Sequence, residues 1–188
     1  MPIARRAALA TLLLGACSSK EPALYTMVAV PGELRRGGPR HVTVREVALA
    51  RILDRQQIVR NAGAVRLDVA GNEWWGEPLE AMTTRLLVEN LGQRLPQSNI
   101  VASTGAISFA GDVTVEVNLQ QLGLIAPGEL TLAAQVSINP RDSVRRTVTR
   151  RFVLTQPLAS ADTPAFVLAA SAAFGQLADA IAGMLVAG

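Results

Sequence analysis

A strict alternation of apolar and polar residues in the second half of the chain constrains the fold most. One stretch places Val113, Val115, Val117 and Leu119 between polar residues, and the next places Leu130, Leu132, Ala134, Val136 and Ile138 at every second position. Successive side chains of a strand point to opposite faces of a sheet, so this period predicts strands with one buried and one solvated face. Turn residues at 127–128 and 139–142 separate them, and residues 144–154 predict a third strand. We expect an antiparallel meander.

The segment of about 78–95 predicts the first of two main helices. Its apolar residues recur at spacings of three to five and share one face: Leu79, Met82, Leu86, Leu91 and Leu95. Pro78 suits a first helical turn, because the N–H that proline lacks would be unpaired there. Glu77 and Glu80 lie near the positive end of the helix dipole. Pro96 marks the end of the helix.

The segment of about 163–185 predicts the second helix, with Thr163 as N-cap and Pro164 as its first residue. A membrane span is the alternative, because the segment is rich in alanine and large apolar residues. Gln176 and Asp179 interrupt the apolar run, however, and an aspartate near mid-span costs about 2.5–3.5 kcal/mol on insertion scales. We therefore expect an amphipathic helix that packs on the sheet.

The first half of the chain adds short strand-like stretches around a loop. Residues 25–30, 41–49, 56–60 and 64–69 are β-rich, and the glycines and prolines of 30–41 predict the loop. Arg35, Arg36 and Arg40 in this loop form either a solvated cluster or a contact with anionic lipid head groups. The whole pattern predicts a single, three-layer-like α/β domain with a mixed sheet.

The N-terminal stretch RRAALATLLLGACSSK, residues 5–20, predicts a secreted and lipid-anchored protein. Two arginines precede an uncharged run that is shorter than the ~20 apolar residues a spanning helix needs, and small residues follow it, as in a signal peptide. Leu14-Gly15-Ala16-Cys17 resembles a bacterial lipobox, in which the cysteine is diacylated with chains such as palmitate and the chain is cut before it. The alternative is an ordinary cleaved signal with an incidental cysteine.

The lipobox divides the chain into a signal peptide at 1–16, a lipidated tether at 17–24 and the α/β domain at 25–188. Two or three acyl chains hold a protein stably on a membrane, whereas one chain holds it marginally. Ser18 and Ser19 follow Cys17, with no aspartate, and by resemblance to the sorting rules of enteric bacteria this favours the outer membrane. The single cysteine, once acylated, leaves no disulfide and no cysteine metal site.

No residue pattern predicts catalysis, a cofactor or a metal. His41 is the only histidine, which excludes a histidine zinc cluster, and no Gly-x-Ser-x-Gly elbow accompanies it. The phosphate-binding pattern GxGxxG is absent, and Glu73, Glu77 and Glu80 either do acid–base work or satisfy the start of a helix. Aromatic residues make up 4% of the chain, and the net charge of +3 includes two arginines of the signal peptide. Nucleic-acid binding therefore has no support.

Two motifs without obvious chemistry connect the chain to a known family. The first is Leu53-Asp54-Arg55 followed by Ile58-Val59-Arg60, and the second is Trp75 with Glu77-Pro78-Leu79 and then Glu89-Asn90-Leu91. Together with the lipobox, an early strand at Tyr25, the meander and the Ala-rich C-terminal helix, they resemble the PqiC (YmbA)-type ABC transport auxiliary lipoproteins. Ala50-Arg51-Ile52 depart from the proline and aromatic residue that the family often has there.

The resemblance implies a fold similar to the N-terminal domain of TolB and a role without turnover in a trans-envelope complex. In that complex an inner-membrane component and an MCE-domain protein form a path for lipids or other hydrophobic molecules across the periplasm of a Gram-negative bacterium. The auxiliary lipoprotein docks the MCE-domain protein at the periplasmic face of the outer membrane and supports membrane integrity, and some members form homo-oligomeric rings. Two alternatives stay open: a structural envelope lipoprotein without a transport role, and a lipoprotein enzyme such as an esterase.

The motif residues allow two roles. Asp54, Arg55 and Arg60 form either a partner-docking surface or a hydrogen-bonded, ion-paired support for their loop. Trp74 and Trp75 are adjacent and cannot point the same way on a strand. We expect Trp75 in the core beside Leu79, and Trp74 exposed as an interface anchor.

Overall fold

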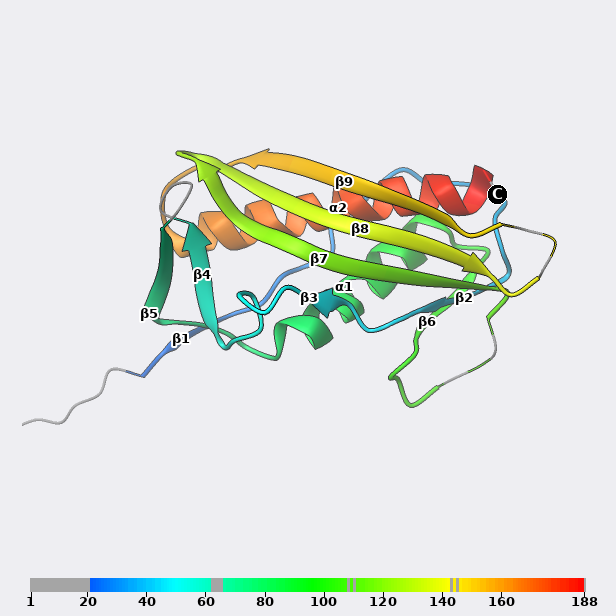
Figure 1. Cartoon of the computed structure of the whole chain (residues 1–188), viewed down its shortest axis with the longest axis horizontal. Coiled ribbons are helices and arrows are strands. Elements are labelled where there is room, and N and C mark those ends of the chain that lie inside the picture. Colours follow the sequence, from blue (N-terminus) through cyan, green and yellow to red (C-terminus); the bar gives the residue numbers. More distant parts are fainter. Residues whose placement is uncertain are drawn as a thin grey trace, which may run out of the picture.

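Three long antiparallel strands run along the longest axis of the protein (Figure 1). The computed structural model describes residues 21–61, 66–107, 109, 111–142, 144 and 146–187. Strand β7 (Val113–Ala126) pairs with β8 (Glu129–Pro140), and β8 pairs with β9 (Val148–Pro157), both in antiparallel register. The apolar positions of the alternation are buried, so the predicted meander is confirmed. Gly128 turns the chain between β7 and β8 with a φ of 77°, a conformation that costs glycine little.

Parallel strands extend this meander into a larger mixed sheet. Strand β2 (His41–Val44) lies between β7 and β6 (Asn99–Ala102) and is parallel to both, and β3 (Ala48–Leu49) pairs with β7. The strand order is β6-β2-β7-β8-β9. The predicted stretch at 41–49 is thus divided into two short strands, and β6 is a strand that the sequence pattern did not indicate.

The remaining strands of the described residues form a second, smaller sheet at one end of the fold (Figure 1). Its central strand β5 (Leu67–Trp75) pairs in parallel with β1 (Ala23–Tyr25) and antiparallel with β4 (Gln57–Asn61). The C-terminal end of the second helix lies at the opposite end of the molecule. The N-terminal strand and the end of that helix therefore mark the two ends of the long axis.

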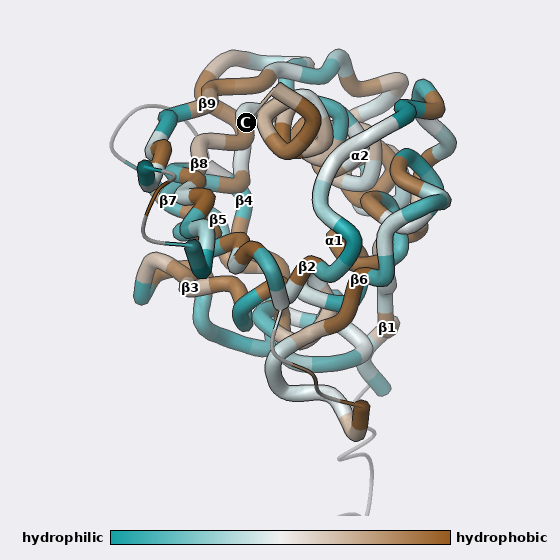
Figure 2. Tube along the Cα trace, turned by 90° about the vertical axis from the view of Figure 1, so that its right-hand side faces the viewer, coloured by the Kyte–Doolittle hydropathy of each residue, from teal (hydrophilic) through white to brown (hydrophobic). Residues whose placement is uncertain are grey.

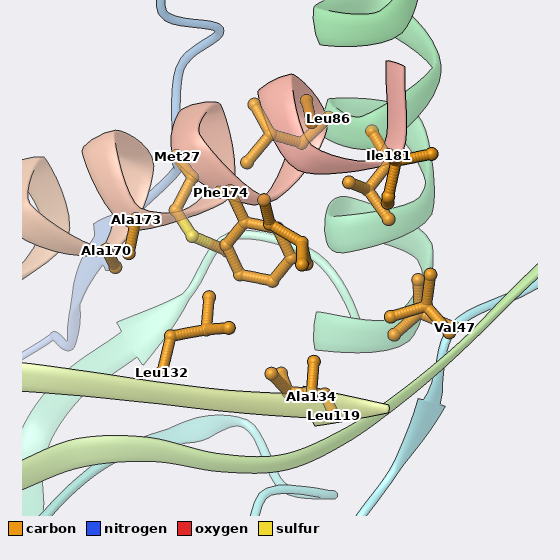
Figure 3. Close-up of a cluster of buried hydrophobic side chains, with 14 of the residues drawn as sticks. Met27, Val47, Leu86, Leu119, Leu132, Ala134, Ala170, Ala173, Phe174 and Ile181 are labelled. Carbon is orange, nitrogen blue, oxygen red and sulfur yellow. The ribbon is translucent and has the colours of Figure 1, made fainter. Parts of the chain in front are cut away.

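Two helices pack on the large sheet and on each other. Helix α2 (Thr163–Ala187) contacts β8 and β9, whereas α1 (Leu79–Arg94) contacts α2, β2 and β6. The predicted apolar face of α1 is buried from Leu79 to Leu95. Figure 3 shows Phe174 pointing from α2 toward strand β8, which carries Leu132 and Ala134. The mixed α/β class with two main helices is therefore confirmed.

Helix α2 is the one helix among the described residues that is long and apolar enough to cross a membrane. Nonetheless, 67% of its most apolar 18-residue stretch is buried inside the fold, against the sheet and α1. Phe166, Ala170, Phe174, Leu177 and Ile181 are all buried there. The helix packs on the sheet, as the sequence predicts, because its apolar stripe has apolar partners within the protein.

The stretch at 25–30 is a strand only at its start, so the prediction of a strand over its whole length is wrong. Beyond β1 the main-chain N–H groups bond to side chains of the two helices instead of to a neighbouring strand. The N–H of Val28 donates to Ser171 Oγ at 3.2 Å, and the N–H of Val30 donates to Asn90 Oδ1 at 3.0 Å. This segment is therefore held between α1 and α2 by polar groups that lie far away in the sequence.

The N-cap of α2 is Asp162. The sequence had predicted Thr163, so that prediction is wrong. Asp162 Oδ1 accepts a hydrogen bond of 2.9 Å from the Ala165 N–H, which satisfies one unpaired donor of the first turn. The Thr163 hydroxyl is buried and has no hydrogen-bond partner within the described part of the chain. The hydrogen bond from the Ala165 N–H, followed by one from Ser160, lowers the pKa of Asp162.

Replacing Asp162 with alanine is expected to lower the melting temperature at neutral pH, because the helix loses its cap. The lowered pKa stabilises the fold above the ordinary pKa of an aspartate, about 3.9, and this stabilisation is lost as the pH falls through the folded-state pKa. The gap in melting temperature between wild type and Asp162→Ala should therefore close in acid. Thermal denaturation followed by circular dichroism from pH 7 to pH 2.5 measures it.

Asp142→Ala is the matched control for this prediction. Asp142 Oδ1 accepts a main-chain hydrogen bond of 2.9 Å from Val144, but in a loop and not at a helix start. Its replacement should change the melting temperature less. A gap for Asp162→Ala that stays constant across the pH range would show that the carboxylate does not act as a charged cap.

Candidate functional site

The apolar residues of the two motifs form the core around the small sheet. Six of them are buried: Leu53, Ile58, Val59, Trp75 and Leu79 here, and Leu91 further along α1. The space left between Leu53, Trp75 and Leu79 has no volume for a water-sized molecule. Trp75 thus lies in the core beside Leu79. These apolar motif residues pack α1 and the loop that contains Leu53 against the sheets. The space between them is too small for a ligand.

Arg60 joins three separate segments by polar contacts. Its Nη2 lies 3.0 Å from Glu73 Oε2 on the neighbouring strand β5, and its Nη1 donates to the Ala161 carbonyl at 3.1 Å. The guanidinium carbon also lies 5.7 Å from the centre of the Phe166 ring, within the range of a cation–π interaction. Arg60 therefore fixes the position of the loop before α2 relative to β4 and β5.

Asp54 and Arg55 are the charged motif residues that remain available at the surface. Both are exposed, and the described part of the chain provides neither side chain with a hydrogen bond or an ion pair. The loop is shaped by main-chain bonds, from Leu53 N–H to the Ala50 carbonyl and from Arg55 N–H to the Leu53 carbonyl. Ion-paired support was one of the two roles that the sequence allowed for Asp54, and its side chain has no such partner among these residues. The ion pair of the motif is formed by Arg60.

Trp74 is partly buried. The sequence had predicted an exposed side chain, so that prediction is wrong. It lies on the central strand of the small sheet, where its register partners are Leu24 of β1 and Gln57 of β4. Its indole N–H donates to the Gly71 carbonyl at 3.3 Å. Trp74 therefore lies on the central strand of the sheet, with its indole N–H bonded to the main chain of its own strand.

Glu77 and Pro78 define the beginning of α1. Pro78 precedes the first helical residue, with a φ of −51° and a ψ of 132°, so it is the N-cap residue and does not lie in the first turn. Glu77 Oε1 accepts a 2.6 Å hydrogen bond from Arg85 Nη2. The ion pair with Arg85 holds the Glu77 carboxylate beside the start of the helix.

The most extensive polar cluster among the described residues centres on Arg94, which sequence analysis did not identify. Arg94 is 1% exposed and pairs with Asp179 of α2 through two hydrogen bonds, of 2.6 Å from Nε and 3.1 Å from Nη2. It also donates to the carbonyls of Val30 and Gly175 at 3.0 Å each. A Cβ at Gly32 would lie 2.2 Å from the guanidinium, so only glycine fits beside it. The cluster joins α1, α2 and the segment after β1.

His41 forms an exposed pair with Asp112. Its Nδ1 lies 3.4 Å from Asp112 Oδ2, both side chains are about half exposed, and the ring packs edge-on against Phe109. No hydroxyl of the described residues bonds to His41. Within those residues, no group of three or more His, Cys, Asp or Glu side chains could hold a metal ion.

Comparison with known proteins shows what kind of protein carries this fold. A family model of the ABC-type transport auxiliary lipoprotein component matches residues 25–182. The crystal structure of an uncharacterised protein superposes with a TM-score of 0.73 at 19% identity, covering 88% of this chain and 99% of that chain. Protein XCC0632 from Xanthomonas campestris gives a TM-score of 0.70 at 16% identity, with 88% and 95% covered. No curated protein matches the sequence.

At these identities the two crystal structures show that the fold is shared, while the family model identifies the group. The match includes both motifs, the meander and α2 as far as residue 182. It agrees with the resemblance carried by Leu53-Asp54-Arg55 and Trp75. The chain belongs to the ABC-type transport auxiliary lipoprotein component family, a group of envelope-associated lipoproteins.

Proposed function

We propose that this protein is a non-catalytic, lipid-anchored subunit of a trans-envelope lipid-transport system. In this role it docks an MCE-domain protein at the periplasmic face of the outer membrane and supports membrane integrity. The observation that carries the proposal is the family match over residues 25–182. The family is described as an auxiliary component of transport, and that description involves no catalytic step.

The anchor in this proposal is an acylated Cys17. This residue lies outside the described part of the structure, as do the signal peptide at 1–16 and the first half of the tether at 17–24. The proposed boundaries agree with the start of the family match at Tyr25. Because β1 begins at Ala23, the tether would join the body of the protein at the small sheet.

The docking surface in this proposal is the loop that carries Asp54 and Arg55. It leads into β4, which lies in the same small sheet as β1, so it is on the part of the protein nearest the proposed anchor. Two exposed charges without partners among the described residues can form ion pairs with a partner protein at no cost to the fold. Charges of this kind determine the rate and specificity of association.

Cross-linking in cells tests this function, followed by detergent extraction, capture of the tagged full chain and mass spectrometry. An MCE-domain protein is expected in stoichiometric amounts. Arg55→Glu should reduce its recovery severalfold, because the charge at the docking loop is reversed. Cys17→Ser should move the protein from the membrane fraction to the soluble fraction, since no acyl chain can then be attached.

Arg141→Glu is the matched control for the docking loop. Arg141 is exposed and follows β8, at the other end of the long axis (Figure 1). Its reversal should leave the recovery of the MCE-domain protein unchanged. Recovery of the chain by itself, or with cell-wall partners alone, would contradict the transport role and favour a structural envelope lipoprotein.

A further inference from the structure

A cavity of about 600 Å³ opens where α2 ends, between the helix and the strands of the meander. Figure 2 looks at this end of the molecule, with the strands on one side and α2 on the other. Its volume lies in the range of about 300–1,000 Å³ that is typical of sites for small molecules. None of the motif residues lines it, so it is separate from the proposed docking loop.

The inner wall of the cavity is apolar. Ile138 of β8 and Phe152 of β9 contribute from the sheet, and Met184 contributes from α2. Phe152 and Met184 are only partly buried although both pack against the core. An apolar ligand here would cover side chains that the fold itself leaves partly open to water, and covering such surface favours binding.

Three arginines line the same cavity, namely Arg35, Arg146 and Arg150. The Arg35 Nε is buried and lacks a hydrogen-bond partner within the described residues, while its Nη2 lies 3.4 Å from the exposed Glu33. Neither Arg146 nor Arg150 forms an ion pair with any residue that the structure describes. These guanidinium groups give the cavity an excess of positive charge.

The carboxylate in the lining does not balance these arginines. Asp179 is the acidic residue among the lining side chains, and both of its oxygens already accept hydrogen bonds from the buried Arg94. A negative charge supplied from outside the chain is therefore what the cavity lacks. Arginine binds a carboxylate through two parallel N–H donors, which makes a carboxylate a suitable head group.

We propose that this cavity binds a fatty acid, with its acyl chain against the apolar wall and its carboxylate at the arginines. This goes beyond the docking role, because a docking subunit does not itself need to bind an amphiphile. The acyl chains of the proposed anchor are not the occupant. They would join the protein before β1, at the opposite end of the long axis (Figure 1).

Photo-cross-linking with the full chain in isolated membranes tests the proposal, using palmitate that carries a diazirine group. The expected cross-links map to peptides that contain Ile138, Phe152 or Met184. Excess palmitate should remove the label and excess hexadecanol should not, because the alcohol lacks the charge. The phospholipids of the membrane are present in every sample and compete with the probe. Labelling by the palmitate probe in their presence therefore shows a preference for a free fatty acid over phospholipid.

Two pairs of variants separate the cavity from general effects. Gly183 lies in α2, and a Cβ there would be 3.9 Å from Arg35 Nη1, so Gly183→Leu fills the cavity while raising helix propensity. Its label should fall to background, whereas Gly92→Leu in α1, where nothing lies within 4 Å of a Cβ, should keep the label. Arg150→Gln should reduce the amount of label roughly tenfold, since a charged hydrogen bond to the carboxylate is removed. Arg151 is the next residue on β9 and does not line the cavity. Arg151→Gln should therefore leave the amount of label unchanged.

Three results would overturn the proposal. Cross-links spread evenly over the surface, or confined to the peptides around β1, would indicate contact with the bilayer alone. Equal competition by palmitate and hexadecanol would show that the arginines do not recognise the head group. Retention of the label in Gly183→Leu would place the probe outside the cavity. None of these results affects capture of an MCE-domain protein through the Asp54 loop, so the two proposals fail separately.

Discussion

Replacing Arg94 with alanine is expected to lower the free energy of unfolding by about 3 kcal/mol. The Arg94 side chain is 1% exposed while its partner Asp179 is 36% exposed, so most of the loss comes from buried acceptors that are left without a donor. The guanidinium is the common donor for Asp179, the Val30 and Gly175 carbonyls and Asn90. The variant leaves these acceptors without their donor and creates a cavity beside Gly32. Urea denaturation followed by circular dichroism measures the loss, which corresponds to a fall in melting temperature of roughly 10 °C.

Arg85→Ala is the matched control on the same helix. The Arg85 side chain is 48% exposed and pairs with Glu77 at 2.6 Å, and exposed ion pairs contribute only about 0–1 kcal/mol. The Arg94 variant should therefore be clearly less stable than the Arg85 variant. Equal losses would show that the buried cluster adds no more to stability than a surface pair.

Replacing Phe174 with alanine is expected to lower the free energy of unfolding by about 3–5 kcal/mol. The side chain is fully buried, at 0% exposure, and it points from α2 toward the strands (Figure 3). Alanine leaves a cavity there, because the surrounding side chains can relax only in part. The same denaturation experiment measures the change.

Leu168→Ala provides the comparison within α2. Leu168 is 63% exposed on the same helix, so its replacement should change stability by about 0.5 kcal/mol or less. The two variants remove apolar side chains from one helix and differ in burial. Similar losses for both would contradict the packing of α2 on the sheet.

The elements that could be predicted from the sequence are those whose pattern is local. The alternation from Val113 to Ile138 and the apolar face from Leu79 to Leu95 both follow from the geometry of a single element, and both are found in the structure. The short strand β6 carries too few residues for a period to be visible. Its parallel pairing with β2 depends on a crossover through α1, which no local pattern describes.

The contacts that could not be predicted join residues far apart in the sequence. Arg94 and Asp179 are 85 positions apart, and each alone looks like an ordinary polar residue at the side of a helix. One signal was present, namely an aspartate within the apolar stripe of α2, and it was used only as an argument against a membrane span. The strand expected at 25–30 failed for the same reason, since the acceptors of its N–H groups lie on distant helices.

The motif could be located from the sequence but only partly explained by it. The core position of Trp75 followed from alternation and from the apolar helix start at Leu79. The division between Arg60, which joins three segments, and Asp54, which remains at the surface, required knowledge of which residues lie nearby. Ala161 and Phe166, the distant partners of Arg60, are about 100 residues further along the chain.

The way the chain runs from β1 into the fold determines how the protein resists a pulling force at its N-terminal side. Tension would reach β1 first, which is held by a parallel register of three residues with β5. Behind it, the hydrogen bonds from Val28 to Ser171, and from Val30 to Asn90, transmit the force to α2 and α1. Arg94 adds a clamp on the Val30 carbonyl. Under tension β1 would detach from β5 first and lengthen the tether, while the fold from Val28 onward stays intact.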